Sequence, residues 1–390
     1  MLVIRRSSWI NRVQEAWKVA SLVWLTGVRR VGKTTLAHSL GEMLYLNCDL
    51  QDVARALEKP ESFFASVQAS VVVLDEVHQL ENPSRVLKIG ADEFPHLKIL
   101  ATGSSTLAAT QKFRDSLTGR KRTVELAPVL HSELSAFGIN DIRHRLLRGG
   151  LPQALLAPEL DRGFYAEWLD SYYSRDVQEL FRIGKRSGFL KLFELIMRQS
   201  GGQAEITTLS RLSGLTRPTV MNYLDVFEVT HVLRAVRPFH GNGRQEILKQ
   251  PKLYAFDTGF VCYNRGWKDV RDEDGGLLWE HLTLDALRTI GPAPRIHYWR
   301  DKNRREVDFV LPVNEQELVG IECKWNEDHL EPGGFKALRA LHPKGANYLV
   351  TPFVTHPYDR TFGSLVVHVL PLDRLLAILH DSGGTSSVGA

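Results

Sequence analysis

One glycine-rich segment of the sequence has residue types and a spacing that suit phosphate binding. Residues 27–34 fit the pattern GxxxxGK[ST], and they stand between an apolar run at 22–25 and a helical pattern. Glycines let backbone N–H groups converge on phosphate oxygens, Lys33 reaches the outer phosphates, and Thr34 is a ligand for Mg2+. The candidate nucleotide-binding residues are Gly27, Val28, Arg29, Arg30, Val31, Gly32, Lys33, Thr34 and Thr35.

Two carboxylates complete this candidate site. Asp75 and Glu76 follow the apolar run 71–74, and ligands of open α/β sheets bind at the carboxyl ends of strands. We predict that Asp75 holds Mg2+ through water and that Glu76 orients or deprotonates the attacking water.

Ser104 follows the next apolar run and is a candidate contact for the γ-phosphate, although serine is also common in turns. Arg120 is a candidate arginine finger toward a neighbouring subunit, and a solvated surface arginine is the alternative.

A second group of charged residues lies near the C-terminus. Glu322 and Lys324 are two residues apart in the predicted strand 318–324, so they share one face of it. Asp308, on a neighbouring predicted strand, can join Glu322 around one hard cation, and Glu280, from a helix, can complete the metal shell. Lys324 would then steady the water or the developing charge. The arrangement resembles PD-(D/E)xK nucleases, and a structural ion-pair cluster remains the alternative.

Residues 207–227 have the pattern of a helix, a turn and a second helix. Gly214 ends the first helix and Thr216 caps the second. A hairpin across 240–243 would form a wing whose basic residues are Arg234, Arg237, Arg244 and Lys249. The alternative role is a lid or a protein contact. The residues that face outward, where a recognition helix contacts DNA, are Arg217, Thr219 and Asn222.

The elements that would position these residues follow from hydrophobic periodicity. The first third alternates helical patterns with short apolar runs, which is typical of a parallel sheet covered on both faces; the runs are 22–25, 44–46, 71–74, 99–101 and 124–126. The middle is mostly helical. From residue 266 the pattern gives a helix, three strands, a further helix and a strand. The predicted fold class is therefore α/β, with a P-loop parallel sheet at its start.

The motifs taken together resemble the prokaryotic AAA+-type ATPases that carry a DUF4143 C-terminal region. The resemblance implies a P-loop ATPase over 1–140, a helical and winged-helix region over 141–265 and a nuclease-like, restriction-endonuclease-like α/β domain over 266–390. It implies ATP and Mg2+ as ligands. Asp176 is a candidate for a salt bridge that ties the helical region to the ATPase. The matching segments are 26–35, 74–78, 102–105, 119–120, 149–152, 173–176, 251–259, 299–302, 306–310 and 321–324.

Two functions are consistent with these motifs. In the first, ATP hydrolysis controls a winged-helix and nuclease-like module on DNA. In the alternative, ATP is the conformational ligand of a binding or signalling switch whose C-terminal fold is catalytically inactive. A homo-oligomer is left open, because AAA+-like cores often work as rings.

Composition excludes several classes of protein. The chain has 390 residues, 43% of them apolar and 24% charged, which argues against extensive disorder. Lys and Arg total 49 against 45 Asp and Glu, a net charge of +4 that permits a nucleic-acid partner without requiring one. Its 3 cysteines are scattered, and no apolar run approaches the ~20 residues of a membrane span. We therefore expect a cytoplasmic protein without a membrane contact.

Overall fold

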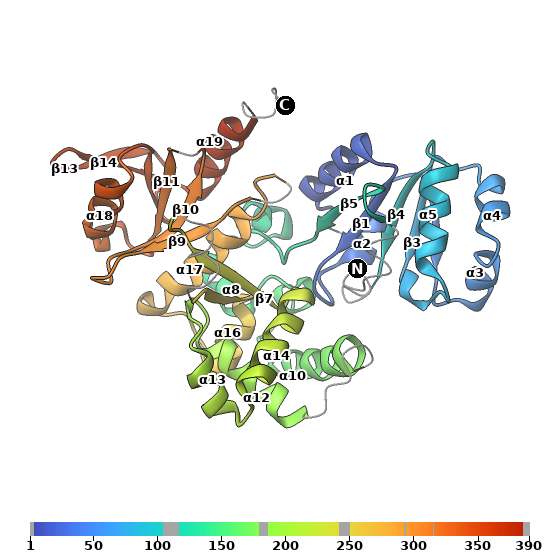
Figure 1. The fold of residues 1–390 in the computed structure, drawn as a ribbon, viewed down its shortest axis with the longest axis horizontal. Coiled ribbons are helices and arrows are strands. Elements are labelled where there is room, and N and C mark those ends of the chain that lie inside the picture. The colour runs from blue at the N-terminus through green and yellow to red at the C-terminus, as the bar shows by residue number, and fades with distance from the viewer. Residues whose placement is uncertain are drawn as a thin grey trace. The chain divides into compact units, whose positions relative to one another are not determined.

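The computed structural model describes residues 4–103, 117–178, 186–241, 250–291, 294–314 and 316–384 (Figure 1). Ser104 lies outside these ranges, so its predicted role stays a prediction. The chain divides into two compact units. The first comprises Met1–Pro128, Leu151–Gly184 and Asp225–Val232, and the second comprises Val129–Gly150, Lys185–Leu224 and Leu233–Ala390. The predicted domain boundaries at 140 and 265 stay a prediction, since the chain enters each unit more than once.

The first unit contains a five-stranded sheet in the order β2-β3-β4-β1-β5, and every neighbouring pair is parallel. The prediction of a parallel P-loop sheet is confirmed. β4 lies between the strand that precedes the glycine-rich loop and the strand that ends in Asp75. The strands are β1 (Leu22–Thr26), β2 (Leu44–Asn47), β3 (Val71–Asp75), β4 (Lys98–Thr102) and β5 (Lys121–Glu125).

Helices cover this sheet and bury its central strands. All residues of β1 are buried, because both of its faces are packed. Trp24, Ile99 and Phe64 belong to one hydrophobic core cluster, which joins the sheet to its helices. The helices in this part of the chain are α1 (Ser7–Val19), α2 (Lys33–His38), α3 (Gln51–Ala56), α4 (Pro60–Ser66) and α5 (Pro83–Glu93).

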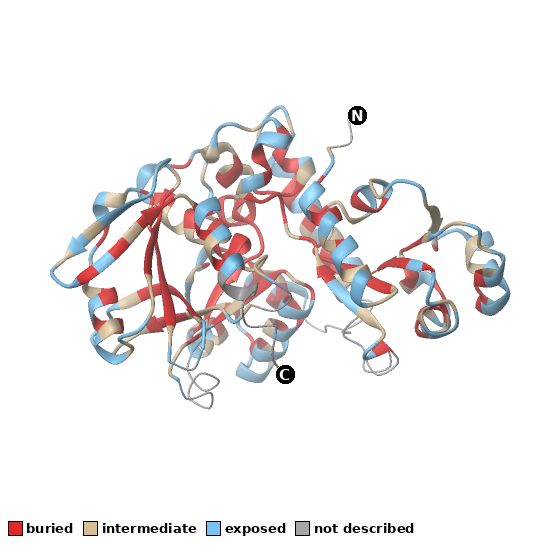
Figure 2. Ribbon diagram, turned by 90° about the horizontal axis from the view of Figure 1, so that it is seen from above, coloured by how far each residue is buried: buried red, intermediate tan, exposed pale blue. Residues whose placement is uncertain are grey.

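The second unit is built on a nine-stranded mixed sheet in the order β13-β14-β12-β11-β10-β9-β7-β8-β6. β7 pairs with β8 and in parallel with β9, so the sheet is continuous across residue 265. β8, β11 and β12 are buried along their whole length. Figure 2 colours the buried residues of the chain red. The strands are β6 (Gly202–Gln203), β7 (Leu233–Pro238), β8 (Lys252–Ala255), β9 (His297–Arg300), β10 (Glu306–Pro312), β11 (Leu318–Cys323), β12 (Asn347–Val350), β13 (Tyr358–Phe362) and β14 (Leu365–Leu370).

Helices make up much of the middle of the chain, and several helices of the second unit pack against its sheet. None of those in the described ranges has the length and apolarity needed to cross a membrane. A π-helix, labelled η3 (Tyr172–Gln178), directly follows α10. The α-helices are α8 (Ile142–Arg148), α9 (Pro152–Leu155), α10 (Arg162–Ser171), α12 (Arg186–Arg198), α13 (Ile206–Ser213), α14 (Arg217–Val229), α16 (Thr258–Arg265), α17 (Asp272–Leu287), α18 (Gly333–Leu341) and α19 (Leu372–Gly384).

The two helices of the predicted helix-turn-helix are present as α13 and α14. Gly214 ends α13 with φ +72°, a left-handed conformation that glycine adopts without strain. The backbone N–H of Thr219 donates to Thr216 Oγ1 at 3.3 Å, which caps the start of α14. The predicted wing is only partly within the described residues, since 242–249 lie outside them. Arg234 is buried in β7, so its predicted place on a basic wing surface is wrong.

Candidate functional site

The glycine-rich loop connects β1 to α2, and its backbone conformation requires glycine at positions 27 and 32. Gly27 has φ +139°, and a Cβ there would lie 2.5 Å from the carbonyl oxygen of Leu126. Gly32 has φ +102° and stands directly before α2. Arg30, between them, is left-handed with φ +60°, a strained conformation for a residue with a side chain. The loop is therefore a close-packed structure that presents its backbone at the start of a helix.

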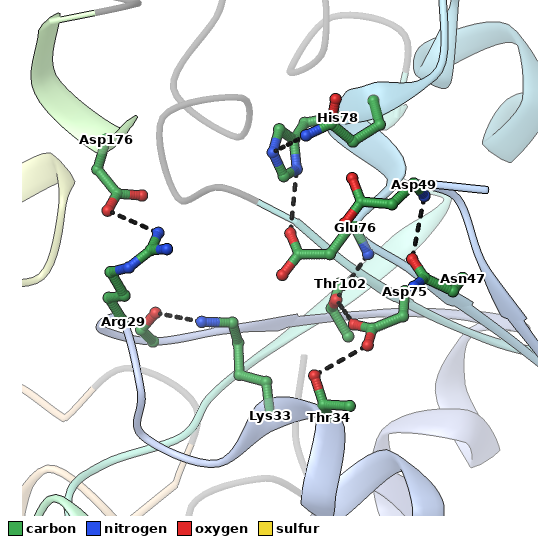
Figure 3. Close-up of polar contacts among 12 residues, drawn as sticks. Arg29, Lys33, Thr34, Asn47, Asp49, Asp75, Glu76, His78, Thr102 and Asp176 are labelled. Atoms are coloured by element: carbon green, nitrogen blue, oxygen red, sulfur yellow. Dashed lines mark hydrogen bonds and ion pairs between the residues drawn. The ribbon is translucent and has the colours of Figure 1, made fainter. Parts of the chain in front are cut away.

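Lys33 is the first residue of α2 and folds back over the loop (Figure 3). Its ammonium donates to the carbonyl oxygens of Gly27 at 3.0 Å and Val28 at 3.2 Å. Burial lowers the pKa of the Lys33 ammonium, and the carboxylates of Glu76 and Asp176 act in the opposite direction. The lysine is thus a cation held close to the loop, where it can bind phosphate oxygens.

Asp75, at the carboxyl end of β3, accepts hydrogen bonds from three hydroxyl groups. Thr34 Oγ1 donates to Asp75 Oδ2 at 2.9 Å, and Tyr45 Oη donates to the same oxygen at 2.6 Å. Thr102, at the end of β4, donates to the other carboxylate oxygen. The structure therefore brings together Thr34 and Asp75, the two residues that the sequence predicts as magnesium ligands. A hydroxyl beside a carboxylate fits Mg2+, which takes oxygen ligands and keeps several waters.

Glu76 follows Asp75 and adopts a left-handed conformation with φ +58°. Its N–H donates to Thr102 Oγ1 at 3.2 Å, and its carboxylate lies 3.2 Å from His78 Nδ1. Burial raises the pKa of the Glu76 carboxyl, and the charge of Asp75 adds to this effect. A carboxylate with a raised pKa is a better proton acceptor, which suits the predicted role of Glu76. Backbone strain at such a position is common in functional sites.

Arg120 does not lie near this loop. It precedes β5, which runs parallel to β1 with Leu22 opposite Lys121, whereas the loop follows the other end of β1. Its guanidinium Nε pairs with Asp92 Oδ1 at 2.6 Å. Arg120 therefore lies where the parallel strands begin, whereas the phosphate loop of its own chain lies where they end. A role as arginine finger toward a second copy stays a prediction.

Residues from two later segments of the first unit contact the loop and its strand. Asp176 Oδ2, in η3, lies 3.5 Å from Arg29 Nη1, which is the ion pair predicted for it. His231, with φ +62°, has its Nε2 2.9 Å from Thr26 Oγ1 and its Nδ1 3.3 Å from a Glu125 carboxylate oxygen. Sequence analysis missed His231, Tyr45 and Thr102. Of these three residues, only Thr102 had a signal in the sequence, because it stands at the end of the strand beside β3.

The predicted C-terminal residues also gather, on α17, β10 and β11. Lys324 Nζ lies 2.8 Å from Glu322 Oε2 and 3.7 Å from Asp308 Oδ2. Burial raises the pKa of Glu280, and the charge of Asp308 raises it further, which places both carboxyl groups in one electrostatic cluster. We call the residues Lys252, Glu280, Glu306, Asp308, Glu322 and Lys324 the buried ion cluster.

Lys252, on β8, belongs to this cluster although the sequence did not indicate it. Its ammonium lies 3.2 Å from Glu280 Oε1 and 2.5 Å from Glu306 Oε1, and its side chain is only 6% exposed. Tyr254 also donates to Glu280. Two of the carboxylates, on α17 and β10, are thus neutralised by an ammonium group from β8, which is not adjacent to β10 in the sheet.

Family models match three consecutive parts of the chain. Residues 20–135 match an AAA domain, residues 139–271 match a domain of unknown function (DUF8612), and residues 275–375 match a domain of unknown function (DUF4143). The chain carries an AAA domain and a DUF4143 region. The AAA domain contains the glycine-rich loop with Asp75 and Glu76, and the DUF4143 region contains most of the buried ion cluster. The resemblance seen in the sequence is confirmed.

Similar proteins give no further assignment of residues. The chain is 25% identical over 335 residues to the uncharacterized proteins Rv2008c of Mycobacterium tuberculosis and Mb2031c of Mycobacterium bovis, covering 83% of this chain and 74% of each relative. The solved structure of the Walker-type ATPase PABY2304 of Pyrococcus abyssi is 15% identical, with a TM-score of 0.44. It covers 67% of this chain and 97% of its own.

The buried ion cluster of the DUF4143 region does not fit a metal ion as it stands. Burial raises the pKa of Glu322 well above its usual range, and a hydrogen bond with Asp308 acts in the same direction. Asp308 Oδ2 also accepts from the N–H of Cys323 at 2.9 Å. Within the described residues, no group of three or more His, Cys, Asp or Glu side chains is arranged to hold a metal. Metal binding by Glu280, Asp308 and Glu322 stays a prediction, and this geometry counts against it.

The candidate DNA-contacting residues lie at the start of α14. Arg217 and Asn222 are exposed. Thr219 is half-buried, and its hydroxyl lies 2.8 Å from that of Thr216, so it serves the helix start. Arg217 and Asn222 are thus the two predicted residues whose side chains are accessible to a partner.

Proposed function

We propose that this protein binds ATP with Mg2+ at the loop between β1 and α2 and hydrolyses the terminal phosphate. The observation that carries the proposal is the 2.9 Å hydrogen bond between Thr34 and Asp75, with Lys33 and Glu76 beside it. Thr34 and Asp75 are 41 residues apart in the sequence, and the types of the four residues match the parts of a phosphoryl-transfer site. The AAA domain supports nucleotide binding by this segment.

The residues divide the work of hydrolysis. The loop N–H groups and Lys33 bind the β- and γ-phosphates. Thr34 and Asp75 would hold Mg2+, which when bound neutralises phosphate charge, and Tyr45 and Thr102 fix the Asp75 carboxylate by hydrogen bonds. Glu76 accepts the proton of the attacking water as its oxygen bonds to the γ-phosphorus and the β–γ bridging P–O bond breaks. ADP and inorganic phosphate are the products.

Lys33→Ala is expected to weaken ATP binding about 100-fold, because it removes the cation nearest the outer phosphates, a loss of about 2.7 kcal/mol. The measurement is a titration of the purified protein with a fluorescent ATP analogue and Mg2+. Lys88→Ala, an exposed lysine of α5, is the matched control and should bind as the wild type does. If Lys33→Ala binds ATP as tightly as the Lys88 variant, the assignment of the loop is wrong.

The partner controlled by the nucleotide is, in this proposal, DNA bound by α13 and α14. Support comes from the exposure of Arg217 and Asn222 at the start of the second helix, the part of a recognition helix that contacts base edges. Arg217→Ala should weaken DNA binding and reduce the slope of log K against log salt by about 1, since one phosphate contact is lost. Fluorescence anisotropy at several salt concentrations measures this slope. Lys191→Ala on α12 is the control, and equal slopes in both variants would remove α14 from a DNA interface.

For the DUF4143 region, the observations favour the second of the two functions, a switch without nuclease activity. Lys252 and Lys324 already provide the positive charge that a metal would supply to the carboxylates. A metal-dependent nuclease remains the competing function, since Glu280, Asp308, Glu322 and Lys324 do gather in one place.

A further inference from the structure

One short segment of the same unit, residues 164–176, contacts the phosphate loop. Trp168 Nε1, on α10, donates to the carbonyl oxygen of Arg29 at 3.0 Å. The guanidinium of Arg30 stands over the ring of Phe164, 5.6 Å from its centroid. Asp176, eight residues after Trp168 and in η3, forms the ion pair with Arg29. Both arginines of the loop therefore have partners in residues 164–176, a segment that supplies no part of the catalytic set.

We propose that Asp176 senses the terminal phosphate of the bound nucleotide by competing with it for Arg29. The inference rests on the proposed ATP site. Without nucleotide, Arg29 pairs with Asp176; with ATP, Arg29 turns to the γ-phosphate and Asp176 loses its partner. ADP has no γ-phosphate, so it leaves the Arg29–Asp176 pair in place. Asp176 is in this role a positioning residue and touches no reacting atom.

The geometry of Arg29 supports an exchange of partners. Its Nη1 lies 3.5 Å from Asp176 Oδ2, which is long for a charge-assisted hydrogen bond. Its Nε is buried and has no hydrogen-bond partner among the described residues. The guanidinium therefore has an N–H donor, at Nε, that no described residue accepts. Arg29 also belongs to the loop that binds phosphate in the proposed function. A phosphate offers a bidentate partner that matches the planar guanidinium better than this single contact.

The charge of Asp176 makes the competition costly for ATP. Its side chain is 16% exposed, and burial raises the pKa of its carboxyl, while Arg29 and Lys33 act to lower it. Asp176 thus depends on the two cations that the phosphates also need. In addition, an anionic carboxylate this close to the loop repels the terminal phosphate. Both effects weaken ATP binding more than ADP binding.

The position of Asp176 gives this competition a consequence for the rest of the unit. η3 is a π-helix, a rare conformation that often marks functional sites. Tyr172, its first residue, hydrogen-bonds Thr230, directly after α14, with the two hydroxyl oxygens 2.7 Å apart. A change at Asp176 therefore acts on a segment tied to the end of α14, the second helix of the helix-turn-helix.

The test is Asp176→Asn, which keeps the shape of the side chain and removes its charge. The dissociation constants of ATP and ADP are measured by titration calorimetry on the full chain. We expect ATP to bind about five-fold tighter or more and ADP to change less than two-fold, a coupling in the usual range. A salt bridge with a purely structural role would instead lower the melting temperature and leave the ratio of the two constants unchanged.

Two further variants keep the outcome decisive. In an Arg29→Ala background, Asp176→Asn should change the ratio much less than in the wild type, because the contested partner is gone and only the direct repulsion of the phosphate remains. Glu167→Gln, an exposed carboxylate of α10, is the matched control and should behave as the wild type. Asp176→Ser replaces the Asn variant if that one does not fold. An unchanged ratio in a protein that binds ATP overturns the inference alone, whereas absence of ATP binding by the wild type overturns the proposed function as well.

Discussion

Glu76→Gln is expected to reduce ATP turnover at least about 100-fold while ATP binding is retained, because the amide cannot accept the proton of the attacking water. The substitution keeps the size and hydrogen-bonding shape of the side chain. Release of inorganic phosphate measures turnover, and titration with a fluorescent ATP analogue measures binding. The matched control is Glu81→Gln, an exposed carboxylate five residues further along the chain, which should leave turnover unchanged.

The pH dependence of ATP turnover is a second test of the role of Glu76 as a base. Glu76 works as a base in its deprotonated form, and burial raises its pKa above the ordinary glutamate value of 4.5. The wild-type rate should therefore fall as the pH is lowered through this raised pKa, and this acidic limb should be absent from the residual rate of Glu76→Gln. Turnover that survives in Glu76→Gln, with an unchanged pH profile, would show that another group is the base.

The nucleotide site was predictable because its signals are local. The glycines, Lys33 and Thr34 lie in one short segment, and Asp75 and Glu76 lie at the end of one apolar run. The parallel sheet then brings the two segments together, because the carboxyl ends of its strands share an edge. Tyr45 could not be predicted in the same way. Its hydroxyl reaches Asp75 only because β2 and β3 pair in register, with Asn47 opposite Asp75.

The predicted elements differ from the structure where polar residues hide the pattern. The apolar run 124–126 predicted the fifth strand too late, since β5 begins at Lys121. β5 stands at the edge of the sheet, and Arg122 and Thr123 are exposed, so half of the strand has no apolar signal. Similarly, α17 begins at Asp272, several residues before its first apolar residue. Three acidic residues occupy its first turn, where they favour the helix start, but none is apolar.

Lys252 shows why the chemistry of the second site could not be read from the sequence. It lies 28 residues before Glu280, on β8, in a region whose pattern predicted helices and a wing. Only the nine-stranded sheet places β8 so that the ammonium meets the carboxylates of α17 and β10. Sequence alone shows three carboxylates and Lys324, which is typical of a metal site. The additional cation changes that interpretation.

Lys252→Met should destabilise the protein by about 3–5 kcal/mol, the usual loss when one member of a buried ion pair is removed. The variant leaves the half-buried Glu280 and Glu306 without their shared ammonium. The deficit should shrink as the pH is lowered, since the pKa of Glu280 is already raised by burial and protonation then removes the uncompensated charge. Urea unfolding between neutral and mildly acidic pH measures the difference. Lys268→Met, an exposed lysine of the same unit, is the control and should change stability little.

Adding Mn2+ turns this variant into a test between the two functions of the DUF4143 region. If the buried ion cluster is structural, Mn2+ without nucleotide should not raise the melting temperature of a Thr34→Ala protein, in which the loop site is impaired. It should partly rescue Lys252→Met made in that background, because a cation can then replace the missing ammonium. A metal-dependent nuclease predicts the reverse: stabilisation of the protein with Lys252 intact, and DNA cleavage that is lost in Glu322→Ala and Lys324→Ala. Such cleavage would show that Lys252 moves aside for a metal and that the region is an enzyme.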